Sequence, residues 1–177
     1  MYDLLQKTEY TLSEKPITLD EAAQTYHDFL NTIICNRRHV FVIGNGGSSG
    51  IAGHHVNDLV NMIRVKAFTI TDSNLITCMA NDYGYESVYS KPLSILFEQN
   101  DLLVAISSSG KSKNILQSVN VAKEKGGKVL TLSGFSTDNP LRQSGDLNIW
   151  TGANDYGLVE SAHFFLLHSM VDTWMGK

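Results

Sequence analysis

The chain has 177 residues, of which 42% are hydrophobic and 18% are charged, and its formal net charge at pH 7 is −4. These values are typical of one globular domain with a sizeable core, spanning residues 1–177. The negative charge disfavours nucleic acid and anionic membranes as partners. No apolar run approaches the roughly 20 residues of a membrane span, and the first residues lack a signal-peptide pattern, so we expect a cytoplasmic protein.

Residues 1–38 are predicted to be helical, in two segments separated by Pro16. In the second segment, ITLDEAAQTYHDFLNTIICN, apolar residues recur with the period of an α-helix. Thr18 followed by Glu21 fits a capping box at the start of this helix.

The two cysteines, Cys35 and Cys78, lie in the apolar stretches NTIICN and LITCMA. Their spacing fits no metal motif, and two cysteines do not make a disulfide framework. The apolar surroundings predict that both are buried, reduced thiols.

From residue 39 onward, short continuous apolar runs alternate with helical segments. Such runs are typical of strands that are buried on both faces of a parallel sheet. The runs are HVFVIG, AFTIT, LLVAIS, KVLTLS and LNIWTG, and helices are predicted near residues 47–64, 74–98, 112–125, 137–144 and 157–175. This order predicts an α/β fold, a three-layer αβα sandwich with a five-stranded parallel sheet and N-terminal helices.

The segment FVIGNGGSSGIAGHHVNDL, residues 41–59, joins the first strand to a helix through a glycine-rich turn. Asn45, Gly46, Gly47 and Ser48 lie where a helix N-terminus offers backbone N–H groups to an anion. A tight turn without a ligand explains the glycines equally well. The segment is no Walker loop, because no Gly-Lys-Ser/Thr follows, and it is a poor dinucleotide fingerprint, because the third glycine position holds Ser49.

A second polar loop, ISSSGKS, follows the third strand and contains Ser107, Ser108, Ser109 and Ser112. Serines in this position can be plain helix caps. However, two polar loops at the carboxyl ends of strands lie where ligands bind in open α/β sheets. The pair of loops favours a small phosphorylated ligand.

His54 and Asp58 are four residues apart on one predicted helix, so they share a face and could hold one metal ion. A solvated surface pair is the alternative interpretation. His55 points about 100° away around the helix, which disfavours a direct role.

The predicted C-terminal helix carries Glu160, His163 and His168 among apolar neighbours. Polar groups in such a helix need partners if they are buried, and a lone buried histidine is usually a satisfied core residue. Glu160 and His168 are separated by about 12 Å along the helix axis. If both serve one site, one of them comes from a neighbouring subunit, which predicts a homo-oligomer.

Taken together, these segments resemble the SIS-domain (sugar isomerase) family of the phosphoheptose isomerase type. GNGGSS, TDSNLITCMANDYG, LLVAISSSGKSKN, GGKVLTLSG and VESAHFFLLH follow in the family's order and spacing over nearly the whole chain. The resemblance implies a flavodoxin-like SIS fold and an aldose–ketose isomerase that converts sedoheptulose 7-phosphate to D-glycero-D-manno-heptose 7-phosphate for lipopolysaccharide or capsule. It also implies a homotetramer that packs through the N-terminal helices and shares its active sites.

The resemblance further implies roles for individual residues. Asp58 and His168 would be the catalytic base and acid. One zinc ion per subunit would bind to His54, Asp58, Glu160 and His168. The phosphorylated sugar would contact Asn45, Gly46, Gly47, Ser48, Asp58, Asn81, Asp82, Ser107, Ser108, Ser109, Ser112 and Glu160.

Two positions depart from the family's usual pattern, because Asp58 stands where Glu is usual and Glu160 stands where Gln is usual. Both keep oxygen ligands for a metal, but they leave the exact phosphosugar open. The alternatives are an isomerase of another phosphosugar, a sugar-phosphate sensor, and a non-catalytic regulator that binds a protein such as a replication initiator. In that regulator branch the carboxylate and terminal histidine positions are typically not retained, so Asp58 and His168 favour the enzyme.

Overall fold

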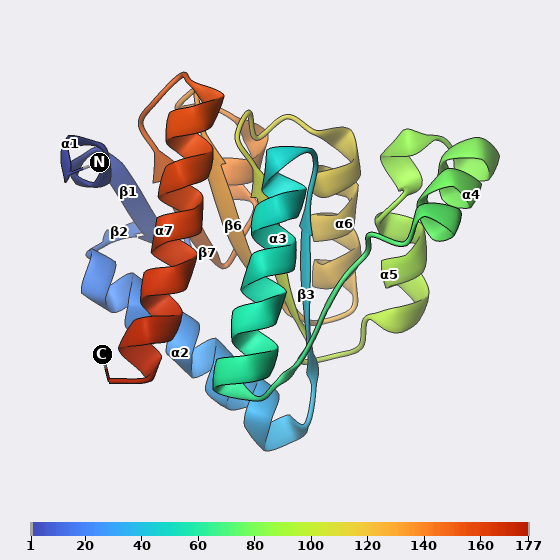
Figure 1. The fold of residues 1–177 in the computed structure, drawn as a ribbon, viewed down its shortest axis with the longest axis horizontal. Coiled ribbons are helices and arrows are strands. Elements are labelled where there is room, and N and C mark those ends of the chain that lie inside the picture. The colour runs from blue at the N-terminus through green and yellow to red at the C-terminus, as the bar shows by residue number, and fades with distance from the viewer. Residues whose placement is uncertain (1, 177) are drawn as a thin grey trace.

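The computed structural model describes residues 2–176, which form one sheet of seven strands in the order β2-β1-β7-β6-β5-β3-β4 (Figure 1). The strands are β1 (Thr8–Leu12), β2 (Lys15–Ile17), β3 (His39–Gly44), β4 (Lys66–Thr69), β5 (Leu102–Ser107), β6 (Lys128–Gly134) and β7 (Leu147–Thr151).

The five strands from β3 to β7 are parallel, as the apolar runs predicted. All residues of β5 and β7 are buried, which explains why β5 is apolar without alternation up to Ser107. In chain order the parallel strands lie 2-1-3-4-5, the order of flavodoxin-like sheets. The direction of strand addition therefore reverses between β3 and β5, and a crevice opens at their carboxyl ends.

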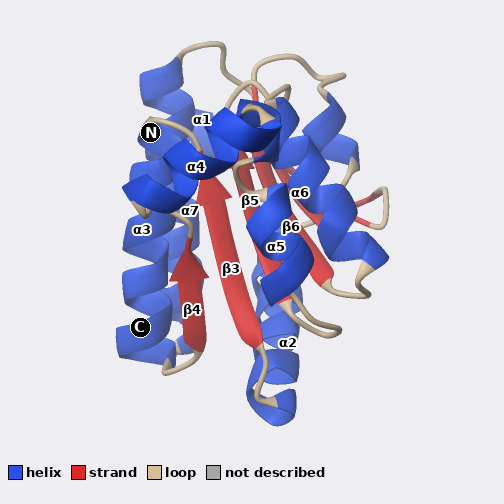
Figure 2. Ribbon diagram, turned by 90° about the vertical axis from the view of Figure 1, so that its right-hand side faces the viewer, coloured by secondary structure: helices blue, strands red, loops and turns tan. Residues whose placement is uncertain are grey.

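Helices cover both faces of the sheet and complete the predicted three layers. Figure 2 looks at the β4 edge, with α3 and α7 on one side of the sheet and α5 and α6 on the other. One core cluster joins the sheet to α2, α3 and α7, and a second joins it to α4, α5 and α6. The helices are α1 (Tyr2–Gln6), α2 (Leu19–Asn36), α3 (Gly47–Asp58), α4 (Ser73–Tyr83), α5 (Ser90–Leu96), α6 (Lys113–Glu124) and α7 (Tyr156–Trp174).

The start of α2 is fixed by a motif that is visible in the sequence. The capping box of α2 is confirmed, because Glu21 N–H donates to Thr18 Oγ1 at 3.3 Å and Thr18 N–H donates to Glu21 Oε2 at 2.7 Å. A π-helical turn, η1 (Leu59–Ile63), extends α3. The helix predicted near 74–98 is instead α4, the 3₁₀ turn η2 (Tyr85–Ser87) and α5, and the one near 137–144 is the 3₁₀ turn η3 (Pro140–Gln143).

The N-terminal region differs from the prediction of two helices. Among residues 2–17 only α1 is helical, and residues 8–17 form the hairpin of β1 and β2, with β1 antiparallel to β7. Buried Thr8 and Tyr10 flank exposed Glu9, so this stretch has the two-residue period of a strand. The hairpin adds two antiparallel strands to the five parallel ones.

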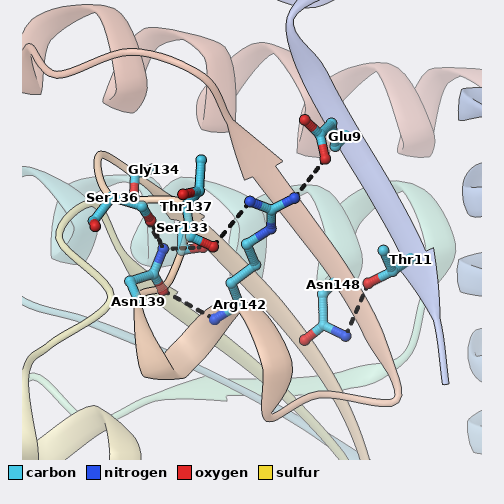
Figure 3. Close-up of polar contacts among 9 residues, drawn as sticks. All are labelled: Glu9, Thr11, Ser133, Gly134, Ser136, Thr137, Asn139, Arg142 and Asn148. Carbon is cyan, nitrogen blue, oxygen red and sulfur yellow. Dashed lines mark hydrogen bonds and ion pairs between the residues drawn. The ribbon is translucent and has the colours of Figure 1, made fainter. Parts of the chain in front are cut away.

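Polar contacts anchor this hairpin to the loop before β7 (Figure 3). Arg142 pairs with Glu9 of β1 and donates to the Thr137 carbonyl at 3.0 Å. The Arg142 guanidinium also lies 4.3 Å from the Trp150 ring centroid. A second link to the hairpin runs from the Asn148 amide, in β7, to Thr11 Oγ1 at 3.4 Å.

The prediction of buried thiols is wrong. Cys35 and Cys78 are both free and exposed. Cys35 lies on the outer side of α2, and Cys78 lies on α4, in which no residue is fully buried, so local apolar sequence did not translate into burial. Among residues 2–176, no helix is long and apolar enough to cross a membrane.

Candidate active site

The glycine loop, residues 44–47, and the serine loop, residues 107–112, meet at the crevice between β3 and β5. The glycine loop leads from β3 into α3, with Gly46 as the N-cap, and the serine loop leads from β5 into α6, with Ser112 as the N-cap. Both helix N-termini therefore face the same edge of the sheet. Their unpaired N–H groups and helix dipoles favour an anion there.

A close contact between the Gly110 backbone and the Asn139 side chain fixes the serine loop. Gly110 has φ of +63°, and a Cβ on it would lie 1.8 Å from Asn139 Oδ1, so no other residue fits without a shift. Asn139 is fully buried, and its amide donates to the carbonyl of Gly134 at 3.0 Å. The loop is thus held against the end of β6.

The serine hydroxyls differ in what they contact. Ser107 Oγ donates to Ser112 Oγ at 3.1 Å, and Ser109 Oγ accepts from the Lys111 N–H at 3.3 Å. Ser108 Oγ is buried and has no hydrogen-bond partner among the described residues. A buried hydroxyl without a partner indicates that a ligand supplies one.

The two loops enclose a cavity of about 130 Å³. Glycine-loop, serine-loop and α7 residues line it together: Asn45, Ser48, Ile106, Ser107, Ser108, Ser109, Ser112, Tyr156 and Glu160. Hydroxyl, amide and helix-terminal N–H groups surround a space of a size that suits one small anionic group. We refer to it as the anion cavity.

Glu160 on α7 connects the anion cavity to a groove between α3 and α7. A Cβ on Gly47 would lie only 2.1 Å from Glu160 Oε2, so the absent side chain at position 47 makes room for this carboxylate. Glu160 also lines the neighbouring groove together with Gly47, His54 and Phe164. The carboxylate therefore lies at the border of the two spaces.

A carboxylate–imidazole cluster lies further along the same two helices, which run side by side in Figure 1. The Asp58 carboxylate is buried and accepts from His168 Nδ1 at 2.8 Å through Oδ2. Its Oδ1 lies 3.7 Å from His54 Nε2. Phe164 packs against both histidines, with ring centroids 4.7 Å from His54 and 6.1 Å from His168.

The cluster has the donor set of a metal site. One ligand atom from each of His54, Asp58 and His168 lies within 4.8 Å of the others. Two imidazoles and a carboxylate are ligands that zinc takes in catalytic sites, where a fourth position stays open. Glu160 is outside this group, because eight residues, about two turns of α7, separate it from His168.

Asn45 belongs to a polar network that no motif predicted. Its amide exchanges two hydrogen bonds with Asn114, at 3.0 and 2.9 Å. Two tyrosine hydroxyls also contact Asn45 Oδ1, from Tyr85 at 3.2 Å and from Tyr89 at 3.3 Å. Partners 40 to 69 residues apart in sequence gave no local signal.

Four further residues lie apart from the cavity and the cluster. Asn81 and Asp82 are exposed on α4, bond to each other at 2.9 Å and do not line the anion cavity. Burial lowers the pKa of His55 to about 4, and its Nε2 pairs with Tyr26 at 2.7 Å. Burial also lowers the pKa of His163 to about 4, and its Nε2 donates to the Ser133 carbonyl, so both histidines belong to the core.

Comparison with known proteins agrees with this architecture. The family model of the SIS domain matches residues 6–134. The phosphoheptose isomerase of Campylobacter concisus is 34% identical over 86% of this chain and 82% of its own length. The solved phosphoheptose isomerase of Neisseria gonorrhoeae is similar with a TM-score of 0.79 and 26% identity, over 89% of this chain and 86% of its own. That of Francisella tularensis also has a TM-score of 0.79, with 28% identity over 86% of this chain and 84% of its own. The chain therefore belongs to the SIS-domain family, among the phosphoheptose isomerases.

Proposed function

We propose that this protein is an aldose–ketose isomerase of phosphosugars that converts sedoheptulose 7-phosphate to D-glycero-D-manno-heptose 7-phosphate through an enediolate. The observation that carries the proposal is the connection between the anion cavity and the Asp58–His168 cluster along α3 and α7. One end of this path suits a phosphate, and the other end suits proton transfer. The relatives named above are called phosphoheptose isomerases, which supports the same substrate.

The phosphate group binds in the anion cavity. Ser107, Ser108, Ser109 and Ser112 offer hydroxyls, and Gly46, Gly47 and Ser48 lie at the start of α3. This end of the substrate does not react, so its role is to position the sugar chain for the chemical step. Asn81 and Asp82 contact the sugar only if α4 moves toward the cavity or the site includes another subunit.

Asp58 and His168 carry the proton transfers. Asp58 removes the proton from the carbon next to the ketone and returns a proton to the former carbonyl carbon. His168 relays a proton between the two oxygens, so that the hydroxyl and carbonyl exchange places and no atoms are gained or lost. The 2.8 Å contact between His168 Nδ1 and Asp58 Oδ2 holds both groups at one point.

We also propose that the cluster binds one zinc ion per subunit. His54, Asp58 and His168 would hold it, with Glu160 of the same or another subunit as a further ligand. Bound there, zinc would polarise the substrate oxygens and stabilise the enediolate charge. The zinc assignment has its own test, which is metal content after purification without chelator.

The arrangement of α7 supports a homotetramer with shared active sites. Glu160 and His168 are about 12 Å apart along the helix, too far for one small ion to reach easily from one copy. The exposed Phe164 and Phe165 line the α3–α7 groove beside Glu160, and Leu158 is exposed near the start of the helix. We propose that this face and residues 1–38 pack against other copies of a single-domain subunit, spanning residues 1–177. The exposed, unpaired Cys35 and Cys78 suit a reducing compartment such as the cytoplasm.

The test is a coupled assay with sedoheptulose 7-phosphate on the wild-type protein and the Asp58→Asn variant. We expect turnover by the wild type and at least a 1,000-fold loss in Asp58→Asn, with the far-UV spectrum unchanged. Binding without turnover by the wild type would instead identify a sugar-phosphate sensor. Neither binding nor turnover would favour the protein-binding regulator, and turnover of a different phosphosugar alone would correct the substrate.

A further inference from the structure

The orientation of the Asn114 side chain is fixed by the backbone. The Ile115 N–H, which can only donate, contacts Asn114 Oδ1 at 3.0 Å. This identifies the amide oxygen and leaves Asn114 Nδ2 facing Asn45. Asn114 is 2% exposed, so it cannot exchange these contacts for water.

The orientation of the Asn45 amide then follows. Its Nδ2 donates to Asn114 Oδ1 at 3.0 Å, and its Oδ1 accepts from Asn114 Nδ2 at 2.9 Å. Rotating the Asn45 amide by 180° would bring oxygen against oxygen and nitrogen against nitrogen in this pair. The pair therefore admits one orientation.

Two tyrosines reinforce this orientation from the other side. The Tyr85 hydroxyl donates to Asn45 Oδ1 at 3.2 Å. The single hydroxyl hydrogen of Tyr89 is shared between Asn45 Oδ1 at 3.3 Å and the Gly44 carbonyl at 2.7 Å. Tyr89 thus also holds the glycine loop at the end of β3.

This network leaves one polar group of Asn45 uncommitted. An amide nitrogen carries two hydrogens, and the hydrogen bonds among residues 2–176 use only one of those on Asn45. Asn45 lines the anion cavity beside the serine loop. The remaining N–H is the group that Asn45 can offer to a ligand in that cavity.

We propose that Asn114, Tyr85 and Tyr89 are positioning residues, which hold Asn45 so that its free N–H donates to a phosphate oxygen. The inference rests on the proposed function, because it takes the ligand to be a phosphorylated sugar. It adds a connection between the two loops, because Asn45 belongs to the glycine loop and Asn114 to the first turn of α6. An Asn45 amide with its oxygen toward the cavity would repel the phosphate instead.

The test compares Tyr85→Phe and Tyr85→Phe/Tyr89→Phe with the wild type. Both variants keep the rings and remove only hydroxyls. We expect the double variant to raise the KM for sedoheptulose 7-phosphate and the Ki of inorganic phosphate together, by about 10-fold, with kcat within twofold. Tyr83→Phe is the control, because Tyr83 is an exposed tyrosine of α4 whose ring contacts Lys91.

Repeating the comparison in an Asn45→Ala background distinguishes a positioning role through Asn45 from a purely structural role of the tyrosines. If the tyrosines act through Asn45, their removal changes KM and Ki no further in that background. An equal loss in both backgrounds would overturn the proposal, as would unchanged KM and Ki in the double variant. If the wild type binds inorganic phosphate but turns over no sugar, the phosphate Ki is replaced by its directly titrated Kd. In that case the proposed function is wrong, and the Kd values of the variants still show whether the tyrosines position Asn45.

Discussion

Replacing Gly47 by Ala tests whether the position of the Glu160 carboxylate affects catalysis. The added Cβ would lie 2.1 Å from Glu160 Oε2, 2.5 Å from Cδ and 2.7 Å from Oε1. Ordinary van der Waals contact begins at 3.4 Å, so the carboxylate must move by about 1.3 Å (3.4 − 2.1). Because the obstacle is the end of a flexible side chain, the backbone can stay in place.

The expected effects on stability and on catalysis therefore have opposite directions. Alanine is better than glycine within a helix by up to about 1 kcal/mol, so the free energy of unfolding should be unchanged or slightly higher. A displacement of about 1 Å in a group that positions substrate can lower the rate about 100-fold. We expect a loss of kcat/KM of that order for Gly47→Ala.

Gly53→Ala is the matched control, because it lies on the same helix and its added Cβ would meet nothing within 4 Å. The assays are urea unfolding and steady-state kinetics with sedoheptulose 7-phosphate. In a Glu160→Ala background, Gly47→Ala should cause no further loss, because the displaced group is gone. If Gly47→Ala keeps kcat/KM within twofold of Gly53→Ala, or if its loss persists in full without Glu160, the position of Glu160 does not control catalysis.

Two further predictions concern stability. Burial lowers the pKa of His163 from 6.5 to about 4 in the folded state, so between these values the unfolded chain binds the proton and stability falls as pH falls. Between pH 7 and pH 5 this histidine should lower the free energy of unfolding by about 2 kcal/mol, and His163→Gln should remove that part of the pH dependence. The measurement is the free energy of unfolding in urea at several pH values, and an identical pH dependence in the variant and the wild type would contradict the prediction. Thr18→Ala removes the N-cap hydroxyl of α2 and should lower the free energy of unfolding by about 1 kcal/mol, and a loss below about 0.3 kcal/mol would show that α2 does not depend on its cap.

The parallel core of the fold could be predicted because burial on both faces leaves a plain sequence pattern. The residues of β5 are apolar without a break up to Ser107, and β3 and β6 are nearly so. The hairpin was missed although Thr8, Glu9 and Tyr10 alternate between buried and exposed. In so short a strand this two-residue period competes with the four-residue spacing of Leu4, Thr8 and Leu12, which fits a helix. Only the pairing of β1 with β7 decides between the two.

The candidate site could be predicted only where a local rule applied. His54 and Asp58 share a helix face, and glycine and serine loops follow strands, so sequence placed them. The roles of Asn114, Tyr85 and Tyr89 depend on contacts across 40 to 69 residues, which no spacing rule describes. Exposure of Asn81 and Asp82 on α4 is likewise a property of packing, because α4 contacts the core only through partly buried side chains such as Leu75 and Met79.

The two helices that bear the site also set how far its two ends lie apart. His54 is six residues beyond Ser48 on α3, and Asp58 is ten beyond, which corresponds to about 9 and 15 Å along the axis. On α7, Glu160 lies at the end of the groove that adjoins the anion cavity, and Phe164 lies one turn further toward His168. A ligand anchored by its phosphate beside Ser48 must therefore extend along the α3–α7 groove before its far end meets an imidazole. Rigid helices packed on a buried sheet keep that separation constant. The fold can therefore discriminate between sugar phosphates by the length of their carbon chain.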